Sequence, residues 1–367
     1  GDLTATADRR EARESDVTFG TLTTIDESLL RFGLIYAGSD DGLIHVSKDG
    51  GNTWVRITNG LPNNLWVSRV AASAHQEGTV YASLNGYRDD HFAAYVFAST
   101  DYGQTWTAIG KNLPAEPVNV VKEDPKNPNL LYVGTDHGLY ISLDKGLTFM
   151  PLSGEGATTR LPAVAVHDVV VHPRDSELLV GTHGRSLYTV DLEYIQQLTD
   201  SILTKPLHLF ALKPVTTSAA WGRKLRYEQA PAYSITIPYI ARQSGRTQAT
   251  VSTDNGLILR TLTDTTEAGL NYLTFDYSHD TAQRATYLTY LNETKKKDAP
   301  PIDLPPADNG KLYIRPGKYK LTLTQNGQTV SRDLEVKAPE RRVRRPVTFA
   351  SPDEFEQWRE QEETERK

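Results

Sequence analysis

Short runs of alternating hydrophobic and polar residues dominate the first half of the chain. Three successive pairs of runs are LIYAG (34–38) and LIHV (43–46), TVYAS (79–83) and AYVF (94–97), and LLYVG (130–134) and LYI (139–141). They are rich in β-branched and aromatic residues and bounded by Gly, Asp and Asn, which is typical of β-strands joined by tight turns. A fourth set spans residues 167–190. The pattern therefore predicts an all-β first half.

A repeated octet follows three of these strand pairs. Its copies are SKDGGNTW (47–54), STDYGQTW (99–106) and SLDKGLTF (142–149), at intervals of about 52 and about 43 residues. Such a period matches one four-stranded blade of a β-propeller. The Asp is expected to accept backbone N–H bonds in a turn, the Gly to permit a positive φ, and the aromatic ring to be buried between strands. We therefore assign structural roles to Asp49, Trp54, Asp101, Trp106, Asp144 and Phe149.

The octet resembles the Asp-box, or BNR repeat. It matches Ser/Thr-x-Asp-x-Gly-x-Thr-Trp fully at two positions and with Phe for Trp at the third. In this respect the chain is similar to the propellers of sialidases, xyloglucan-degrading glycoside hydrolases and the sortilin (VPS10) ectodomain. The phrases GTDHG (134–138) and GTHGR (181–185) resemble large bacterial secreted BNR-repeat or glycosyl-hydrolase-like proteins. The resemblance covers residues 17–195, and it implies that the boxes lie away from the active face.

Four blades are too few for blades of this size, which we expect in a ring of seven or eight. We interpret residues 17–195 as a partial propeller and the polar residues 1–16, which begin with Gly1 rather than Met, as a linker. An open half-ring would expose two apolar sheet faces. We therefore expect the missing blades in an N-terminal portion, either continuous with the chain or cleaved but still bound. A closed four-bladed ring is the alternative.

The second half of the chain predicts another β domain. Residues 196–217 form a linker, with helical periodicity over residues 191–203, and residues 218–338 read as strands with hairpin signals at DNG (254–256) and NG (326–327). This run predicts a sandwich. It resembles the Ig-like domain at the end of many bacterial secreted enzymes, through GLNYLTFD (269–276) and PGKY (316–319). A charged tail with a short helix is expected over residues 339–367.

Composition narrows the classes of function. The chain has 367 residues, 38% hydrophobic, no Cys and a net charge of −6, which excludes disulfides, thiolate metal sites and Cys nucleophiles. Four Arg within residues 341–345 stand beside an acidic helix, so nucleic acid is not an expected partner. No run approaches the roughly 18 apolar residues of a membrane span. We expect no cofactor, no metal and no transmembrane segment, and the resemblance implies a secreted, periplasmic or surface protein of a bacterium.

The ligand face of a propeller is the end where the loops after the second strand of each blade converge. The candidates at this end are Asp40, Asp41, Arg69, Tyr87, Arg88, Asp89, Asp136, His137, His167, His183 and Arg185. Glycoside hydrolysis needs two carboxylates, for which Asp136 and Asp168 are the candidates. A sialidase would also need a Tyr nucleophile paired with a Glu, and no such pair stands out. The spacing of the histidines matches no metal-binding pattern.

Three hypotheses about function remain open. The leading one is a secreted or cell-envelope propeller protein whose face recognises a glycan or a protein partner. The second is a xyloglucanase-like glycoside hydrolase whose other catalytic half lies in the missing N-terminal blades. The third is a non-catalytic assembly scaffold. The structural repeats are complete and the catalytic set is incomplete, which favours the first hypothesis.

Overall fold

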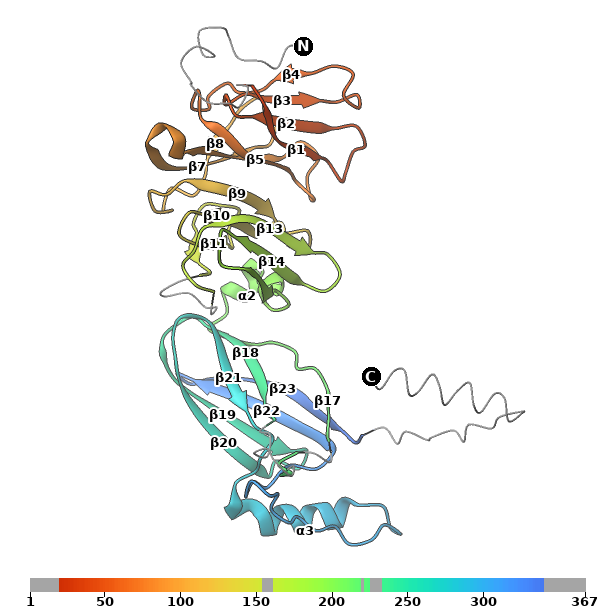
Figure 1. Ribbon diagram of the computed structural model, residues 1–367. Coiled ribbons are helices and arrows are strands. Elements are labelled where there is room, and N and C mark those ends of the chain that lie inside the picture. Colours follow the sequence, from red (N-terminus) through yellow and green to blue (C-terminus); the bar gives the residue numbers. More distant parts are fainter. Residues whose placement is uncertain (1–19, 154–160, 219–220, 225–232, 340–367) are drawn as a thin grey trace, which may run out of the picture. The chain divides into compact units, whose positions relative to one another are not determined.

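The computed structural model describes residues 20–153, 161–218, 221–224 and 233–339, which form mainly antiparallel strands with few helices (Figure 1). The chain divides into two compact units. The first comprises residues up to His208 together with Ile240–Arg242 and Ala268–Leu270, and the second comprises the remainder. The predicted linker (1–16) and the predicted helix of the tail lie outside the described residues.

Four consecutive meanders build the described part of the first unit, and each strand pairs with its neighbours in sequence. The sheets are β1 (Leu22–Glu27), β2 (Ile35–Ser39), β3 (Ile44–Ser47) and β4 (Val55–Arg56); β5 (Trp66–Ala72), β6 (Val80–Gly86), β7 (His91–Ser99) and β8 (Thr107–Ala108); β9 (Val118–Glu123), β10 (Leu131–Thr135), β11 (Leu139–Ser142) and β12 (Met150–Pro151); and β13 (Val166–His172), β14 (Glu177–Thr182) and β15 (Leu187–Asp191). The first strands of successive sheets touch, β1 with β5, β5 with β9 and β9 with β13. This is how propeller blades are arranged.

A β-bulge recurs in the first strand of each of these four sheets. The register shifts leave one extra residue in each strand, namely Thr23, Ser68, Asn119 and His167. Thr23 Oγ1 donates to the backbone carbonyl of Val67 in the second sheet at 2.6 Å. Ser68 Oγ likewise donates to the carbonyl of Val118 in the third sheet at 2.7 Å. In the first two sheets the bulge therefore turns a polar side chain toward the following sheet.

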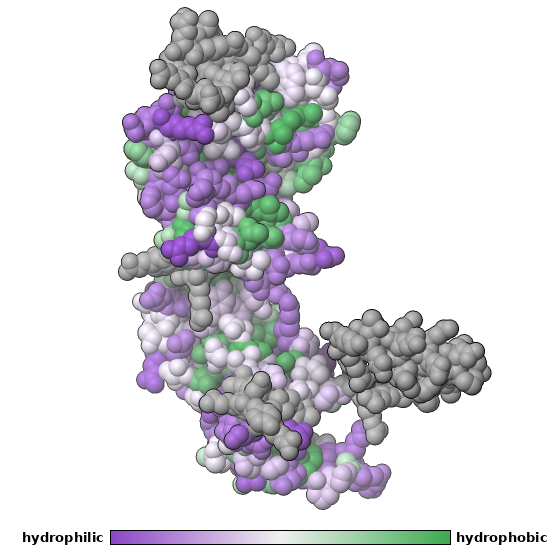
Figure 2. Space-filling view, in the orientation of Figure 1, coloured by the Kyte–Doolittle hydropathy of each residue, from purple (hydrophilic) through white to green (hydrophobic). Residues whose placement is uncertain are grey.

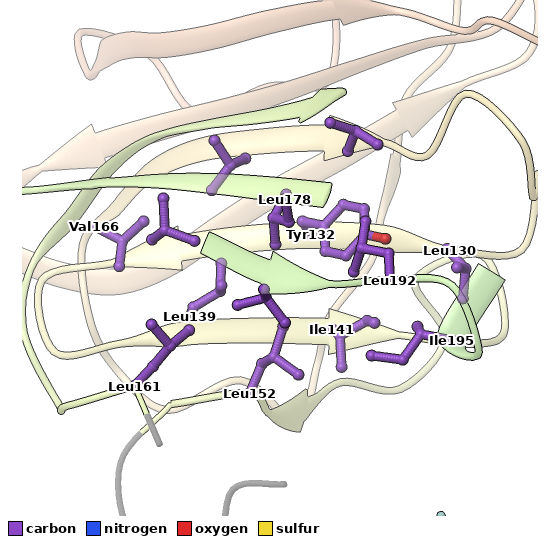
Figure 3. Packing of buried hydrophobic residues seen from close by; sticks show 14 of the residues in the cluster. Leu130, Tyr132, Leu139, Ile141, Leu152, Leu161, Val166, Leu178, Leu192 and Ile195 are labelled. Atoms are coloured by element: carbon purple, nitrogen blue, oxygen red, sulfur yellow. The ribbon is translucent and has the colours of Figure 1, made fainter. Parts of the chain in front are cut away.

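Three hydrophobic clusters fill the spaces between adjacent sheets. Tyr36 belongs to the cluster between the first and second sheets, and Tyr81 to that between the second and third. Tyr132 lies in the cluster between the third and fourth sheets, next to Leu178 and Leu192 (Figure 3). Because each sheet buries side chains on a shared face, the blades stabilise one another chiefly through removal of apolar surface from water.

A buried carboxylate links the second and third sheets. Glu123, at the end of β9, is 5% exposed. Its oxygens accept hydrogen bonds from Ser73 Oγ and the Ala74 amide at 2.7 Å, and from the Tyr81 hydroxyl at 2.9 Å. Three donors replace the water that this charge loses on burial, which is the condition for keeping a buried carboxylate.

The repeated octets form matching turns between the third and fourth strands of the first three sheets. Asp49 accepts the amide and hydroxyl of Thr53 at 2.9 and 2.6 Å and the hydroxyl of Ser47 at 2.8 Å. The copies centred on Asp101 and Asp144 repeat the three bonds. These bonds, first that from the Thr53 hydroxyl, lower the pKa of Asp49 to about 2. Each Asp therefore works inside its own turn.

The aromatic residues that close the octets differ in their contacts. Trp54 Nε1 donates to the carbonyl of Gly51 within its own turn at 3.0 Å. Trp106 Nε1 instead reaches the carbonyl of Ile57, just after β4, at 2.6 Å. Phe149 is 6% exposed and packs between the second and third sheets. The second octet thus ties one blade to the blade before it.

Two further sheets contain the remaining strands, most of whose residues belong to the second unit. One contains β16 (Leu207–Leu209), β18 (Ile235–Ala241) and β21 (Gly269–Phe275), and the other contains β17 (Val215–Thr216), β23 (Gln328–Lys337), β22 (Gly317–Gln325), β19 (Gly245–Thr253) and β20 (Ile258–Thr266). Asn326 and Gly327 join β22 to β23 with φ of 47° and 77°, as the hairpin signal predicts. The Tyr319 hydroxyl donates to the carbonyl of Arg315, four residues upstream. Such a bond also occurs in Ig folds, and the Ig-like assignment stays a prediction.

The described helices differ from those expected. The segment 191–203 forms two short pieces, η2 (Ile195–Gln197) and α2 (Asp200–Leu203). Within the region read as strands, η3 (Thr281–Gln283) leads into α3 (Arg284–Thr294). Tyr287 and Leu291, one helical turn apart, are buried and anchor α3. The hairpin signals on either side made this interval look like continuous β structure.

Candidate functional site

The predicted ligand face lies at one end of the meanders. In an antiparallel meander, the start of the first strand and the turn between the second and third strands share an end. The bulges therefore lie at the same end as the turns that follow β2, β6, β10 and β14, whereas the octets, between the third and fourth strands, lie at the opposite end. We call the first of these ends the loop face.

A chain of amides joins the second and third sheets on the loop face. Asn85 Nδ2, at the end of β6, donates to Asn119 Oδ1 at 2.8 Å. Asn119 Nδ2 in turn donates to Asp136 Oδ1, also at 2.8 Å. Asn119 is the bulged residue of β9 and is 9% exposed. The candidate Asp136 is thus fixed from one side by a buried amide.

Arg69 and Asp168 meet in an ion pair. Arg69 Nη2 lies 2.7 Å from Asp168 Oδ1, and the two side chains are 32% and 55% exposed. Arg69 is on β5 of the second sheet and Asp168 on β13 of the fourth. The ion pair therefore joins the second sheet to the fourth, although the third sheet lies between them in the sequence. It is accessible to solvent, so a ligand can reach both groups, although each already has a charged partner.

The hairpin between β6 and β7 carries exposed aromatic rings. Tyr87 in η1 (Tyr87–Asp89) is 60% exposed and Phe92 is 47% exposed. Their ring centroids lie 6.1 Å apart with an interplanar angle of 80°. The guanidinium of Arg88 stacks 3.9 Å above the ring of Trp66. We call Trp66, Tyr87, Arg88 and Phe92 the aromatic tip.

The backbone of this hairpin is held in place locally. Asn85 Oδ1 accepts the amide of Tyr87 at 2.9 Å, and Asp90 has a left-handed φ of 55° that ends η1. Asp is one of the few residues other than glycine that adopts this conformation readily. His91 stacks on Tyr95 with centroids 5.5 Å apart. The rings of the tip thus rest on a defined turn.

Each of three histidines on the loop face lies close to one other side chain, which is a histidine or a glutamate. The rings of His167 and His183 lie 5.3 Å apart, and both residues are exposed. His137 Nδ1 stands 3.7 Å from Glu116 Oε1, and Arg185 is exposed in the turn after β14. Across the described residues, no group of three or more His, Cys, Asp or Glu could hold a metal ion.

Asp40 and Asp41 lie inside the turn after β2 and are 4% and 0% exposed. Asp40 Oδ1 accepts the amides of Gly20 and Thr21 at 2.7 and 2.9 Å. Asp41 Oδ1 accepts the amide of Leu43 at 3.3 Å and the hydroxyl of Ser39. In contrast, Asp89 is exposed within η1. The first-sheet acids therefore organise the turn rather than project from it.

Three residues of the loop face were not singled out from the sequence, namely Asn119, Trp66 and Phe92. Asn119 occupies the same place in its strand as the polar residues Thr23 and Ser68, but this equivalence appears only once the strands are paired. Trp66 and Phe92 flank the turn but belong to strands, and their position on the tip follows from the pairing of β5, β6 and β7.

Comparison with known proteins finds a partial sequence similarity to one curated protein. No family model matches it. A xyloglucanase of Hypocrea jecorina is 30% identical over an alignment of 143 positions, and the match covers 34% of this chain and 17% of that protein. The chain therefore spans well under two thirds of the length of this relative. In sequence, it is similar to a glycoside hydrolase over part of its length.

Two solved structures match the chain at low identity and low TM-score. The GH74 enzyme of Niastella koreensis matches at 14% identity with a TM-score of 0.38, covering 86% of this chain and 50% of that chain. PorZ, a surface component of the type-IX secretion system of Porphyromonas gingivalis, matches at 12% identity with a TM-score of 0.38, covering 87% and 39%. Likeness at this level carries no argument about function. Among the described helices, none is long and apolar enough to cross a membrane.

Proposed function

We propose that the chain recognises a glycan at the aromatic tip of the loop face, as part of a secreted or surface protein. The observation that carries the proposal is the pair of exposed rings, Tyr87 and Phe92, beside Arg88 on a defined hairpin. Large exposed aromatic residues gathered in one place are typical of interaction sites.

Carbohydrate chemistry suits such a surface. A pyranose ring presents a face of C–H bonds that stacks on an aromatic ring, and hydroxyl groups at its edge that need polar partners. Tyr87 and Phe92 offer the rings, and the neighbouring Arg88 and Asp89 offer exposed polar groups. The similarity to a xyloglucanase makes xyloglucan the first glycan to test.

The experiment measures binding of xyloglucan to the 367-residue chain by isothermal titration calorimetry or affinity electrophoresis. The double variant Tyr87→Ala with Phe92→Ala is expected to weaken binding about tenfold or more, because buried aromatic contacts dominate such interfaces. Phe32→Ala is the matched control, since Phe32 is 94% exposed in the turn between β1 and β2, at the opposite end of the blade. An equal loss in both variants, or none in either, would refute the proposed site.

Glycoside hydrolysis is the second candidate, favoured by the similarity to a xyloglucanase. The acids available on the loop face are Asp136, bonded to Asn119, and Asp168, paired with Arg69. If the chain hydrolyses xyloglucan, Asp136→Asn or Asp168→Asn should abolish release of reducing sugar without preventing binding. Release that survives both substitutions would exclude these carboxylates. Binding without release in the parent chain would leave recognition as its function.

A further inference from the structure

We propose that the outer faces of the first and fourth sheets are docking surfaces for further blades of the same repeat, carried by the same polypeptide outside these residues. The strand registers of the four sheets allow each exposed residue on these faces to be compared with its equivalents inside the unit. The surface of the protein shows hydrophobic patches among polar residues (Figure 2).

Leu187 gives the clearest comparison on the fourth sheet. Leu187 is on the third strand of its sheet and pairs with Gly181 on the second strand. The equivalent pairs in the three earlier sheets are Ile44 with Gly38, Val96 with Ser83 and Leu139 with Gly134. Those equivalents are 0%, 1% and 0% exposed, since the following sheet covers them. Leu187 is 74% exposed.

Leu179 repeats the comparison at a second position. Its pairing with Val170 matches that of Tyr36 with Asp26, Tyr81 with Ala71 and Tyr132 with Lys122. The three tyrosines are 0%, 5% and 0% exposed, whereas Leu179 is 38% and Val170 53% exposed. The fourth sheet therefore presents an apolar face of the kind that each earlier sheet buries.

The first sheet presents the complementary face. Leu22 is 50% exposed, whereas its equivalents Val67, Val118 and Val166 are 0%, 0% and 1% exposed. Ile25 is 64% exposed, and its equivalents Val70, Val121 and Val169 are 1%, 0% and 3% exposed. Inside the unit, the valines of these two sets pack toward the preceding sheet.

These two faces define the occupant. A face like that of the fourth sheet receives the first strand of a following blade, and a face like that of the first sheet packs against a preceding blade. After β15 the chain forms the short pieces η2 and α2 and enters the second unit past His208, so the blade on the fourth sheet must come from another segment. One run of blades that precedes β1 and closes the ring covers both faces. The bulged residues Thr23 and Ser68 each donate a hydrogen bond to the following sheet. Their equivalent in β13, His167, is exposed.

The test uses single introduced thiols, because the chain has no Cys. Leu187→Cys is labelled with a maleimide in the 367-residue chain and in the complete natural polypeptide, with the parent proteins as blanks. Leu147→Cys is the matched control, because Leu147 lies in the third octet turn and is 73% exposed. We expect equal labelling of the two thiols in the 367-residue chain, and labelling of Cys at position 187 slowed about tenfold or more in the complete polypeptide.

Three results would overturn the proposal. The first is unchanged labelling at position 187 in the complete polypeptide. The second is a complete polypeptide that holds no further repeats of this kind. The third is protection in the 367-residue chain itself that rises with concentration and accompanies a dimeric mass in light scattering, because a second copy would then be the occupant.

Discussion

Glu123 provides the sharpest test of how the blades are held together. Its carboxylate is 5% exposed and accepts three hydrogen bonds from the second sheet. A hydrogen bond to a charged group contributes about 1.5–3 kcal/mol. Glu123→Ala leaves the three donors without their carboxylate acceptor but also removes the cost of burying that carboxylate, so we expect a net loss of about 3 kcal/mol in the free energy of unfolding. That corresponds to roughly 6–12 °C in melting temperature.

The assay is urea unfolding of the 367-residue chain followed by Trp fluorescence, since the first unit contributes Trp54, Trp66 and Trp106. Glu177→Ala serves as the control, because Glu177 is exposed on β14. Tyr81→Phe removes one of the three donors and should cost about 1 kcal/mol. If Glu123→Ala stays within about 0.5 kcal/mol of the control, the range typical of surface substitutions, the carboxylate does not couple the two sheets.

Three further predictions concern the interfaces and turns. Gly134→Ala should lower the free energy of unfolding by about 1–3 kcal/mol, because a Cβ at this position would lie 2.8 Å from the Val166 carbonyl oxygen. Gly181 is the equivalent residue of the fourth sheet, and a Cβ there would lie 3.5 Å from its nearest atom. Gly181→Ala should therefore be nearly neutral when both variants are compared by calorimetry. Trp106→Phe should destabilise the chain by about 1 kcal/mol in urea unfolding by removing the bond to the Ile57 carbonyl; a loss no larger for Trp106→Phe than for Trp54→Phe would contradict this. The pKa values of Asp49 and Asp101 are lowered from 3.8 to about 2 in the folded chain, so their stabilisation is complete above about pH 4 and lost as the pH falls toward 2. Asn at both positions should lower the free energy of unfolding at pH 7 and flatten its dependence on pH between about 4 and 2, as measured by urea unfolding across that interval; a parent-like stability at pH 7 would contradict this.

The repeat made the strands of the first unit predictable from sequence. Each octet marks the turn between a third and a fourth strand, and the alternating runs before it supply the strands. The bulges were not predictable from this pattern, because a bulge is visible in the pairing and not in one strand alone. Thr23, Ser68, Asn119 and His167 share polarity but not chemistry, so a search for a repeated residue type passes over them.

The loop face was harder to predict than the fold. Tyr87, Arg88 and Asp136 lie in the segments that follow second strands, but that position in the sequence could not distinguish an exposed acid from a buried one. Asp40 is held by long-range bonds from the amides of Gly20 and Thr21, which its position in the sequence does not reveal, whereas Asp41 bonds within its own turn to Ser39. The pairing of Arg69 with Asp168 spans 99 positions, and no local pattern encodes a contact of that range. Whether these residues bind a ligand stays a prediction.

The bulge in every first strand also bears on how such a chain can change over evolutionary time. Each sheet fixes its own register and offers its neighbour the same kind of contact, a polar side chain directed at a main-chain carbonyl in the first two sheets. Main-chain carbonyls are present whatever the sequence, so this contact tolerates divergence of the neighbouring repeat. A duplicated repeat would carry its own bulge and hence its own contact with the neighbouring sheet. The number of repeats can therefore change by copying whole units.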